Sequence, residues 1–528
     1  MKQIILICLT LVSLFFNTAL AADLSKLVIL HTNDTHGYDE KAKEILGMAA
    51  VSALKQDYEN QGFTVVLLDA GDAIEGNTLA NYSEGKAAME FMNACGYDAM
   101  TLGNHEFGYG QDVLLKRIKE ANFPVLSANI SVKATGQNFV RDAVVITRNG
   151  YKLGIFGLTT PETTTSINPK YVQGLTFLAG PQLYACAQAE IDKLRKEGCQ
   201  VIIALAHLGS SNVVVGNRAE DLLNNVQGLD ICIDGHDHVV KNCYVKSCLL
   251  VETGCHLANI GMLTFKENKW QEKFVPAGSY DKEDTKVQAL VAKRSKEVAQ
   301  YLNKKIGYSE VVLHGERVPG VRTQETNLGD LFADAYLWQA RNAKVSKAQI
   351  DCALVNGGGI RTSLAVGKIT RDDIMTVTPF KNQGCFVTLT GAELLEMLEA
   401  ATSITPEPLG GFPQVAGIVY TINTKVPFTK GQQYRNSQYY APLKPGERVT
   451  IKSVGNKPFA LDKKYTLATS EFIANGGDAY GVLNQQPHNK TLLGYTEEQV
   501  LINYIKEGLH GVIGQQYAKP QDRITILQ

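Results

Sequence analysis

The sequence predicts an α/β domain built in layers, followed by a second domain of the α+β class. In the first half, short apolar runs alternate with helical or irregular segments, which is typical of layered α/β domains. An amphipathic segment at 284–304 separates this half from a second one, in which strands and helices mix less regularly. A chain of 528 residues also suits two or three domains, each with its own core.

Apolar runs account for the strands that we expect in the first domain. They lie at 27–31, 65–69, 100–103, 125–128, 153–158, 201–207 and 229–234. Polar residues that can bind metal ions lie at or just beyond the C-terminal end of most of these runs. Open α/β sheets place their sites at that end of their strands, so we expect these residues to meet at one edge.

Residues 284–304 predict a helix of about five turns. Apolar residues recur there at helical spacing, with charged residues between them: Val287, Leu290, Val291, Val298, Tyr301 and Leu302. Its position between two differently organised halves indicates a connector, where a hinge between domains would lie. We therefore expect a signal peptide at 1–21, a first domain at 22–283, a connecting helix at 284–304 and a second domain at 305–528.

The N-terminus has the pattern of a secretory signal peptide. Lys2 precedes an apolar stretch at 4–16, and Ala19 and Ala21 form a small-x-small cleavage site. The mature chain would begin near Ala22 or Asp23, in the periplasm or outside the cell, with no membrane span left after cleavage. The alternative is an uncleaved membrane anchor, for which the apolar stretch is short.

Charge and cysteine content narrow the function further. The net charge is −1 and no long basic block occurs, so binding to a nucleic acid polymer is not expected.

Of ten cysteines, nine remain once Cys8 is lost with the signal peptide. Four of them crowd one stretch, where a disulfide between Cys243 and Cys248 is the simplest expectation. A zinc knuckle is less expected, because the CxxC spacing is missing.

Five separate segments each end an apolar run with residues that bind metals. They are Asp34-Thr35-His36, Gly71-Asp72, Asn104-His105-Glu106, His207 and Gly235-His236-Asp237-His238. Together they supply two carboxylates, one amide and four imidazoles as ligands, which is enough for two metal ions that share a bridging aspartate. This combination indicates a dinuclear metallophosphoesterase.

Phosphate esters resist hydrolysis because the phosphorus group is already anionic. Two divalent ions about 3.5–4 Å apart neutralise that charge and lower the pKa of a bridging water. We expect Asp72 to bridge the ions, Asp34, His36 and His238 to bind the first ion, and Asn104, His207 and His236 to bind the second. Manganese, zinc, cobalt or iron suit such ligands. His105 should contact the phosphoryl oxygens or the leaving group.

These motifs resemble the 5′-nucleotidase family of calcineurin-like metallophosphatases. That family includes UDP-sugar hydrolases, ecto-5′-nucleotidases and 2′,3′-cyclic-nucleotide phosphodiesterases. The resemblance implies a metallophosphoesterase β-sandwich flanked by helices, followed by an α+β substrate-binding domain. It covers nearly the whole mature chain, because the second half also carries motifs of the family.

The motifs of the second half are similar to the family's nucleotide-binding segments. They are Arg322 with Asn327-Leu328-Gly329-Asp330-Leu331, the glycine-rich loop Asn356-Gly357-Gly358-Gly359-Ile360-Arg361, Pro379-Phe380, and Phe472-Ile473-Ala474-Asn475-Gly476-Gly477-Asp478. The resemblance implies that Phe380 and Phe472 stack the nucleobase and that Asp478 binds the ribose hydroxyls. Arg322 and Arg361 would hold the phosphate, with Asn356 and Gly358 in the loop that faces it.

The chain departs from the family pattern at two positions near the predicted metals. The family often has an aspartate three residues after the catalytic histidine, where it orients the imidazole ring. Gly108 stands there, so His105 is expected to lack this partner. His238 stands where the nucleotidase branch usually has asparagine or glutamine, a change that can alter metal preference.

The predicted function is that of an exported phosphohydrolase that removes phosphate from nucleoside 5′-monophosphates, with UDP-sugars as further substrates in the family. One alternative is a 2′,3′-cyclic-nucleotide 2′-phosphodiesterase/3′-nucleotidase. A second is a hydrolase of sulfur esters on a carrier protein, which the paired Phe segments disfavour. A third, from outside the enzymes, is a nucleotide-binding surface protein.

Overall fold

The computed structural model of the protein describes residues 23–528, except 213–214, 344, 346–347 and 486–487. The predicted signal peptide therefore lies outside the described residues. Within them, no helix has both the length and the apolar character that crossing a membrane requires.

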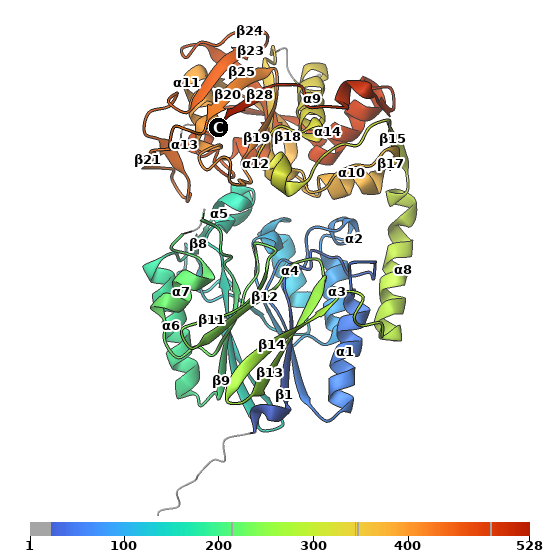
Figure 1. Cartoon of the computed structure of the whole chain (residues 1–528), viewed down its shortest axis with the longest axis vertical. Coiled ribbons are helices and arrows are strands. Elements are labelled where there is room, and N and C mark those ends of the chain that lie inside the picture. Colours follow the sequence, from blue (N-terminus) through green and yellow to red (C-terminus); the bar gives the residue numbers. More distant parts are fainter. Residues whose placement is uncertain (1–22, 213–214, 344, 346–347, 486–487) are drawn as a thin grey trace, which may run out of the picture.

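Two six-stranded sheets make up the first half of the chain (Figure 1). The first sheet has the order β14-β13-β1-β2-β3-β4 and contains β1 (Leu27–Thr32), β2 (Thr64–Asp69), β3 (Ala99–Thr101), β4 (Val125–Leu126), β13 (Asn259–Lys266) and β14 (Lys269–Pro276). The second has the order β11-β12-β10-β9-β7-β6 and contains β6 (Ala143–Arg148), β7 (Tyr151–Thr159), β9 (Val201–His207), β10 (Ile231–Ile233), β11 (Val240–Val245) and β12 (Cys248–Thr253).

The two sheets pack face to face, and helices cover their outer faces. Every residue of β1 and of β9 is buried, because one face of each strand meets the other sheet and the opposite face meets helices. Helices α1 (Met48–Asn60) and α3 (Lys86–Cys95) pack on the first sheet, and α6 (Pro181–Lys196) and α7 (Ala219–Asn225) on the second. The predicted β-sandwich flanked by helices is confirmed.

The strands that precede the predicted ligands run parallel to one another within each sheet. In the first sheet β1, β2, β3 and β4 are parallel, and in the second β7, β9, β10 and β12 are parallel. Their C-terminal ends therefore lie at one edge of the sandwich, which faces the second half of the chain (Figure 1). Each of the predicted apolar runs overlaps one of these strands, so the strand predictions are confirmed, with small shifts of their ends.

The predicted connecting helix is present as α8 (Thr285–Leu302). Its buried residues Val287, Val291 and Val298 belong to the same core as α1 and α3, so its apolar face packs against the first half. Helix α8 then leads directly into β15 (Lys305–Ser309) of the second half (Figure 1). The exact bounds of the domains stay a prediction.

The second half mixes parallel and antiparallel strands with helices, as expected for the α+β class. Its largest sheet has the order β19-β16-β25-β18-β26, formed by β16 (Cys352–Asn356), β18 (Gln383–Thr390), β19 (Pro413–Ala416), β25 (Lys464–Ser470) and β26 (Lys490–Thr496). Smaller sheets contain β15, β17 (Gly367–Thr370) and β27 (Val512–Ile513), and β20 (Ile418–Asn423), β23 (Val449–Val454), β24 (Lys457–Pro458) and β28 (Ile524–Leu527). The longer helices are α9 (Asn327–Asn342), α10 (Arg371–Val377), α11 (Gly391–Ala400) and α14 (Glu497–Asn503).

Short elements complete the described chain. In the first half they are α2 (Thr78–Tyr82), α4 (Gln111–Glu120), α5 (Thr163–Ser166), β5 (Ile130–Val132) and β8 (Leu175–Phe177). In the second half they are α12 (Glu471–Ala474), α13 (Val482–Gln485), β21 (Lys430–Gln433) and β22 (Tyr440–Pro442). Helix α5 extends from the site edge of the sandwich towards the second half (Figure 1).

The expected disulfide between Cys243 and Cys248 is wrong, because the nine cysteines of the described residues are all free. Strands β11 and β12 form a hairpin in which Cys243 pairs with Leu250 and Cys248 pairs with Val245. The two cysteines are therefore diagonal neighbours, about 7–8 Å apart in such a ladder, which exceeds the reach of a disulfide.

Candidate active site

The predicted metal ligands meet at the edge where the parallel strands end. They form two groups, and within each group the ligand atoms lie within 4.8 Å of one another: Asp34, His36 and His238, and Asp72, His207 and His236. The first group comes from the loops after β1 and β10, so it joins the two sheets. Each set contains residues that the sequence assigns to one ion, and Asn104 lines the same pocket as Asp72 and His236; the division between two ions stays a prediction.

Asp72 lies between the two groups. Its Oδ2 atom is 3.1 Å from Nε2 of His207 and 3.9 Å from Nε2 of His36. One carboxylate thus faces an imidazole of each group, which is the position that a bridging ligand requires.

Hydrogen bonds hold two of the imidazoles in the orientation of metal ligands. Nδ1 of His36 donates to the backbone carbonyl of Glu75 at 2.7 Å, and Nδ1 of His207 donates to that of Ala70 at 2.7 Å. These bonds fix the tautomer and leave each Nε2 facing the group. Among the described residues, Asn104 Oδ1 is buried without a hydrogen-bond partner, and the buried His207 Nε2 faces the Asp72 carboxylate at 3.1 Å. Buried polar atoms placed in this way fit the ligand shell of a divalent metal.

The protonation of the first group also suits metal binding. Burial lowers the pKa of His36 and of His238 well below the usual value for histidine, and the positive charge of neighbouring side chains lowers it further. Both rings are therefore neutral near pH 7, and neutral imidazole is the form that binds metals.

The ligand loops have an unusual backbone conformation. Asp34, His36, Asp72, His236 and His238 have φ angles of 48°, 49°, 58°, 93° and 62°. A positive φ costs a non-glycine residue on the order of 1–3 kcal/mol, and it persists only where surrounding contacts hold it. Backbone bonds supply such contacts, since the N–H of Asp34 donates to Gly71 and that of His36 to Asp72.

The Glu106 carboxylate joins the ligand loop after β2 to the ligand loop after β3. Its carboxylate accepts hydrogen bonds from the backbone N–H groups of Asp72 and Ala73, each at 2.8 Å, and of Gly103 at 2.7 Å. This glutamate, which follows His105 in the sequence, therefore positions Asp72 and Asn104 through the main chain.

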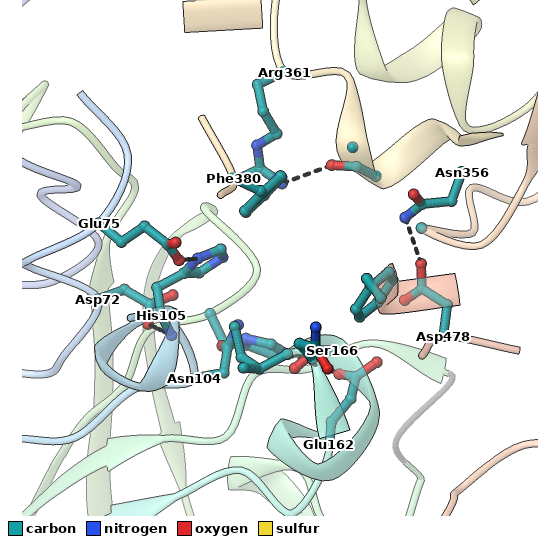
Figure 2. Close-up of a pocket in the computed structure, with 18 of the residues that line it drawn as sticks. Asp72, Glu75, Asn104, His105, Glu162, Ser166, Asn356, Arg361, Phe380 and Asp478 are labelled. Carbon is teal, nitrogen blue, oxygen red and sulfur yellow. Dashed lines mark hydrogen bonds and ion pairs between the residues drawn. The ribbon is translucent and has the colours of Figure 1, made fainter. Parts of the chain in front are cut away.

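His105 begins a single helical turn after β3 and points into the space above the metal ligands. Its backbone N–H donates to Asp72 Oδ1 at 2.7 Å, and its Nδ1 lies 2.7 Å from Glu75 Oε2. The ring of Phe380, from the second half, lies nearly parallel to the His105 ring at a centroid distance of 5.9 Å. Figure 2 shows His105 between Glu75 and the open pocket.

The pocket above the metal ligands is lined by both halves of the chain (Figure 2). The first half contributes Asp72, Asn104, His105, His236 and His238, and the second contributes the seven predicted substrate-binding residues, Arg322, Asn356, Gly358, Arg361, Phe380, Phe472 and Asp478. Asp34, His36 and His207 are buried beneath it. The structure thus brings together every site residue that the sequence predicts.

Three guanidinium groups, those of Arg317, Arg322 and Arg361, line the pocket and lie close enough to repel one another. The pKa of Arg322 is lowered well below its usual range because the group loses hydration and because Arg317 and Arg361 repel its charge. The pKa of Arg361 is lowered for the same two reasons, burial and the charge of Arg317. Such a cluster favours an anion, and guanidinium groups bind phosphate in bidentate geometry.

A polar pair lies across the pocket from the metal ligands. Asn356 Nδ2 donates to Asp478 Oδ2 at 2.8 Å, and the backbone N–H of Asp478 donates to the carbonyl of Thr165 in the first half at 2.7 Å. Burial raises the pKa of Asp478 to about 7, although the bond from Asn356 opposes this change. Hydrogen-bond donors favour the ionised form of such a buried carboxyl, and a ligand that carries hydroxyl groups would supply them.

Family models match both halves of the chain. A calcineurin-like phosphoesterase model matches residues 27–240, and a 5′-nucleotidase C-terminal domain model matches residues 305–485. The chain belongs to the 5′-nucleotidase family. It is therefore a phosphoric monoester hydrolase, and the family implies divalent metal ions at its site.

Individual relatives agree with this family assignment. The 5′-nucleotidase of Vibrio cholerae is 28% identical over 91% of this chain and 90% of its own length. The trifunctional nucleotide phosphoesterase protein YfkN of Bacillus subtilis is 30% identical over 91% of this chain, but the chain spans only 34% of that relative. The crystal structure of a 5′-nucleotidase precursor from Thermus thermophilus matches with a TM-score of 0.78 at 28% identity, over 95% of this chain and 99% of its own.

His105 lacks the aspartate of the 5′-nucleotidase family, as the sequence indicates, but a carboxylate from another loop contacts its ring. Gly108 replaces the family's aspartate, yet His105 does not lack a carboxylate partner, because Glu75 contacts its Nδ1. Glu75 follows β2, and thirty residues separate it from His105 in the sequence. The sequence pattern around His105 could not indicate this contact.

The pocket of this 5′-nucleotidase family member contains two further residues, Glu162 and Arg317, that were not predicted from the sequence. Glu162, from the loop after β7, lies 2.8 Å from His236 Nε2 and accepts a hydrogen bond from Tyr439 of the second half at 3.2 Å. The rule that found the ligands, a polar residue after a buried strand, would also have found Glu162. Arg317 lies in an irregular segment without such a signal.

Proposed function

We propose that this hydrolase releases phosphate from nucleoside 5′-monophosphates and acts outside the cytoplasm. The observation that carries the proposal is the shared pocket, in which the metal-ligand groups face a cluster of arginines and the Asn356–Asp478 pair. A nucleoside monophosphate has matching parts: a dianionic phosphate, a ribose with two hydroxyls and a flat base.

Seven residues would hold two divalent ions in this proposal. Asp34, His36 and His238 would bind one, Asn104, His207 and His236 the other, and Asp72 both. When bound, two such ions neutralise phosphate charge and lower the pKa of a water between them. Manganese, zinc, cobalt and iron all suit this mixture of nitrogen and oxygen ligands.

The remaining residues bind and orient the substrate. With Nδ1 held by Glu75, His105 presents Nε2 to the pocket, where it hydrogen-bonds the phosphoryl oxygens or the leaving oxygen as negative charge develops. Arg322 and Arg361 hold the phosphate, and Asp478 accepts hydrogen bonds from the ribose. Phe380 and Phe472 stack the base, and such stacking contributes about 1–3 kcal/mol per base whatever its identity.

A second candidate activity is the hydrolysis of 2′,3′-cyclic nucleotides. The name of the YfkN relative, a trifunctional nucleotide phosphoesterase, supports testing more than one substrate. UDP-sugars form a third substrate class to include. Because the chain belongs to a hydrolase family, we reject the alternative of a non-catalytic nucleotide-binding protein.

Phosphate release from AMP and from 2′,3′-cyclic AMP under the same conditions tests the proposal. We expect release from AMP that is lost in EDTA and restored by manganese, and no release from an Asp72→Asn variant. Release from the cyclic nucleotide alone would assign the chain to the phosphodiesterase alternative. Because opening of the cyclic ester yields 3′-AMP and no free phosphate, 3′-AMP is measured as well, and formation of neither phosphate nor 3′-AMP would reject both activities.

Export is tested separately. In cells that express the full chain, we expect the mass of the recovered protein to place its N-terminus at Ala22 or Asp23. An Ala21→Arg variant should keep the leader, since signal peptidase needs a small residue before the cut. A wild-type protein that retains residue 1 and stays in the cytoplasm would contradict export.

A further inference from the structure

We propose that Glu75 is the positioning residue of His105 and that Gly108 is glycine because the Glu75 carboxylate occupies the space beside it. This inference deepens the proposed function and rests on it, since it assigns the residue that orients the imidazole. It derives from three observations: the contact between Glu75 and His105, the second bond made by Glu75, and the surroundings of Gly108.

The contact between Glu75 and His105 is short and shielded from water. Oε2 of Glu75 lies 2.7 Å from Nδ1 of His105, and the exposed fractions of the two side chains are 1% and 12%. A carboxylate this buried needs a polar partner, and an imidazole N–H is a suitable one. With Nδ1 bonded to Glu75, the ring has one tautomer and one orientation, and Nε2 faces the pocket (Figure 2).

The same glutamate orients a second imidazole through its main chain. The carbonyl of Glu75 accepts the bond from Nδ1 of His36, a predicted metal ligand. The His36 and His105 rings meet edge to face at a centroid distance of 4.9 Å. Glu75 therefore sets the position of His105 relative to the metal-ligand group, through its side chain on one side and its backbone on the other.

Gly108 is not required by its backbone conformation. Its φ and ψ are −59° and −21°, which any residue adopts readily. A Cβ atom at this position would, however, lie 2.1–2.2 Å from the carboxylate atoms of Glu75. Glycine is thus required by the space that Glu75 fills.

This geometry predicts that the two positions can exchange roles. With Glu75 shortened, the space beside His105 opens to a side chain from position 108. An aspartate introduced there would bring a carboxylate into the region that the Glu75 carboxylate now occupies. In the presence of Glu75, the same aspartate would clash with it and repel its charge.

The test compares kcat and KM for AMP in five variants: Glu75→Gln, Glu75→Ala, Gly108→Asp, and Glu75→Ala combined with Gly108→Asp or with Gly108→Asn. Loss of an orienting partner typically costs about 10–100-fold in activity. We expect Glu75→Ala to lower kcat by such a factor with KM nearly unchanged, and Gly108→Asp alone to lower kcat as well. The double variant Glu75→Ala/Gly108→Asp should recover most of the activity that Glu75→Ala loses. The double variant Glu75→Ala/Gly108→Asn should not.

Two measurements separate positioning from folding. Bound metal and Tm should stay near wild type in Glu75→Ala. In the EDTA-treated protein labelled with ¹⁵N-histidine, the His105 signals, assigned with a His105→Gln variant, should show Nδ1 protonated in the wild type and a mixture of tautomers in Glu75→Ala. This second readout requires no activity.

An unchanged kcat or an unchanged tautomer in Glu75→Ala would overturn the inference. So would equal recovery by the aspartate and asparagine pairs, because asparagine supplies volume without charge. A wild type that releases no phosphate from AMP would reject the proposed function, and the tautomer measurement would still decide the role of Glu75.

Discussion

The Nε2 atoms of His36 and His238 lie 3.1 Å apart, although the two residues follow strands of opposite sheets. Both rings are neutral near pH 7 because their pKa values are lowered. A metal ion bound by these atoms together with Asp34 would join the loop after β1 to the loop after β10. Metal binding should therefore stabilise the sandwich as well as serve catalysis.

Metal removal should lower the melting temperature. A ligand present at a hundred times its Kd stabilises the folded state by about 2.7 kcal/mol. In a domain of this size, that corresponds to a shift in Tm of about 5–10 °C. Differential scanning fluorimetry with EDTA or manganese measures the shift. It should shrink in His238→Ala and stay at the wild-type value in His314→Ala, whose side chain is exposed. Equal shifts in both variants would contradict a metal at His238.

Removal of the guanidinium of Arg361 should weaken catalysis on every phosphate ester. The group belongs to the cluster with Arg317 and Arg322, which an anionic substrate would neutralise. Hydrogen bonds to charged groups contribute about 1.5–3 kcal/mol, so Arg361→Ala should lower kcat/KM by about 10–150-fold. Arg361→Lys should recover only part, because lysine lacks the bidentate geometry. Arg294→Ala, which removes an ion pair between Arg294 of α8 and Glu90 of α3, is the matched control.

Substitution of Asp478 should affect nucleotides selectively. If its carboxylate binds ribose, Asp478→Ala should lower kcat/KM for AMP by about 10–100-fold, the value of a bond to a charged group. The same variant should hydrolyse p-nitrophenyl phosphate, which has no ribose, at nearly the wild-type rate. An equal loss on both substrates would show that Asp478 supports the site in general and not the nucleoside.

Asp39 should make stability depend on pH. Burial raises its pKa to about 7, and its Oδ1 has no hydrogen-bond partner among the described residues. The folded state therefore keeps a proton that the unfolded state has lost above pH 4. Stability should fall by up to about 1.4 kcal/mol per pH unit from pH 4 to pH 7 and level off above.

An Asp39→Asn variant removes this titration. The difference in Tm between Asp39→Asn and wild type should grow from pH 5 to pH 7 and should not grow further at pH 8. The exposed Asp192→Asn substitution is the control and should leave the pH profile unchanged. A constant difference between Asp39→Asn and wild type at every pH would contradict the raised pKa.

Much of the fold and the ligand set was predictable because both depend on local signals. The strand from Val201 to His207 is apolar along its whole length, since it is buried on both faces, and such a run can be recognised without a structure. His207 ends that run, and Asp34, Asp72 and His236 follow runs of the same kind. Parallel strands bring their C-terminal ends to one edge, so ligands on separate strands were expected to meet.

The loops between strands were less predictable. Asp72 and Glu75 lie in one loop after β2, but only Asp72 was expected in the site. The disulfide predicted for Cys243 and Cys248 failed for a related reason, because closeness in sequence does not fix the register of a hairpin.

The sequence by itself determined which strands are buried, which residues follow them, and therefore which side chains could bind metal and phosphate. Tertiary structure decided how the loops run: the positive φ angles of Asp34 and His36, the gathering of Arg317 with Arg322 and Arg361, and the choice of Glu75 as the partner of His105. The physical reason is that burial of both faces leaves a continuous apolar run along a strand. A contact between loops thirty residues apart depends on packing and leaves no such pattern.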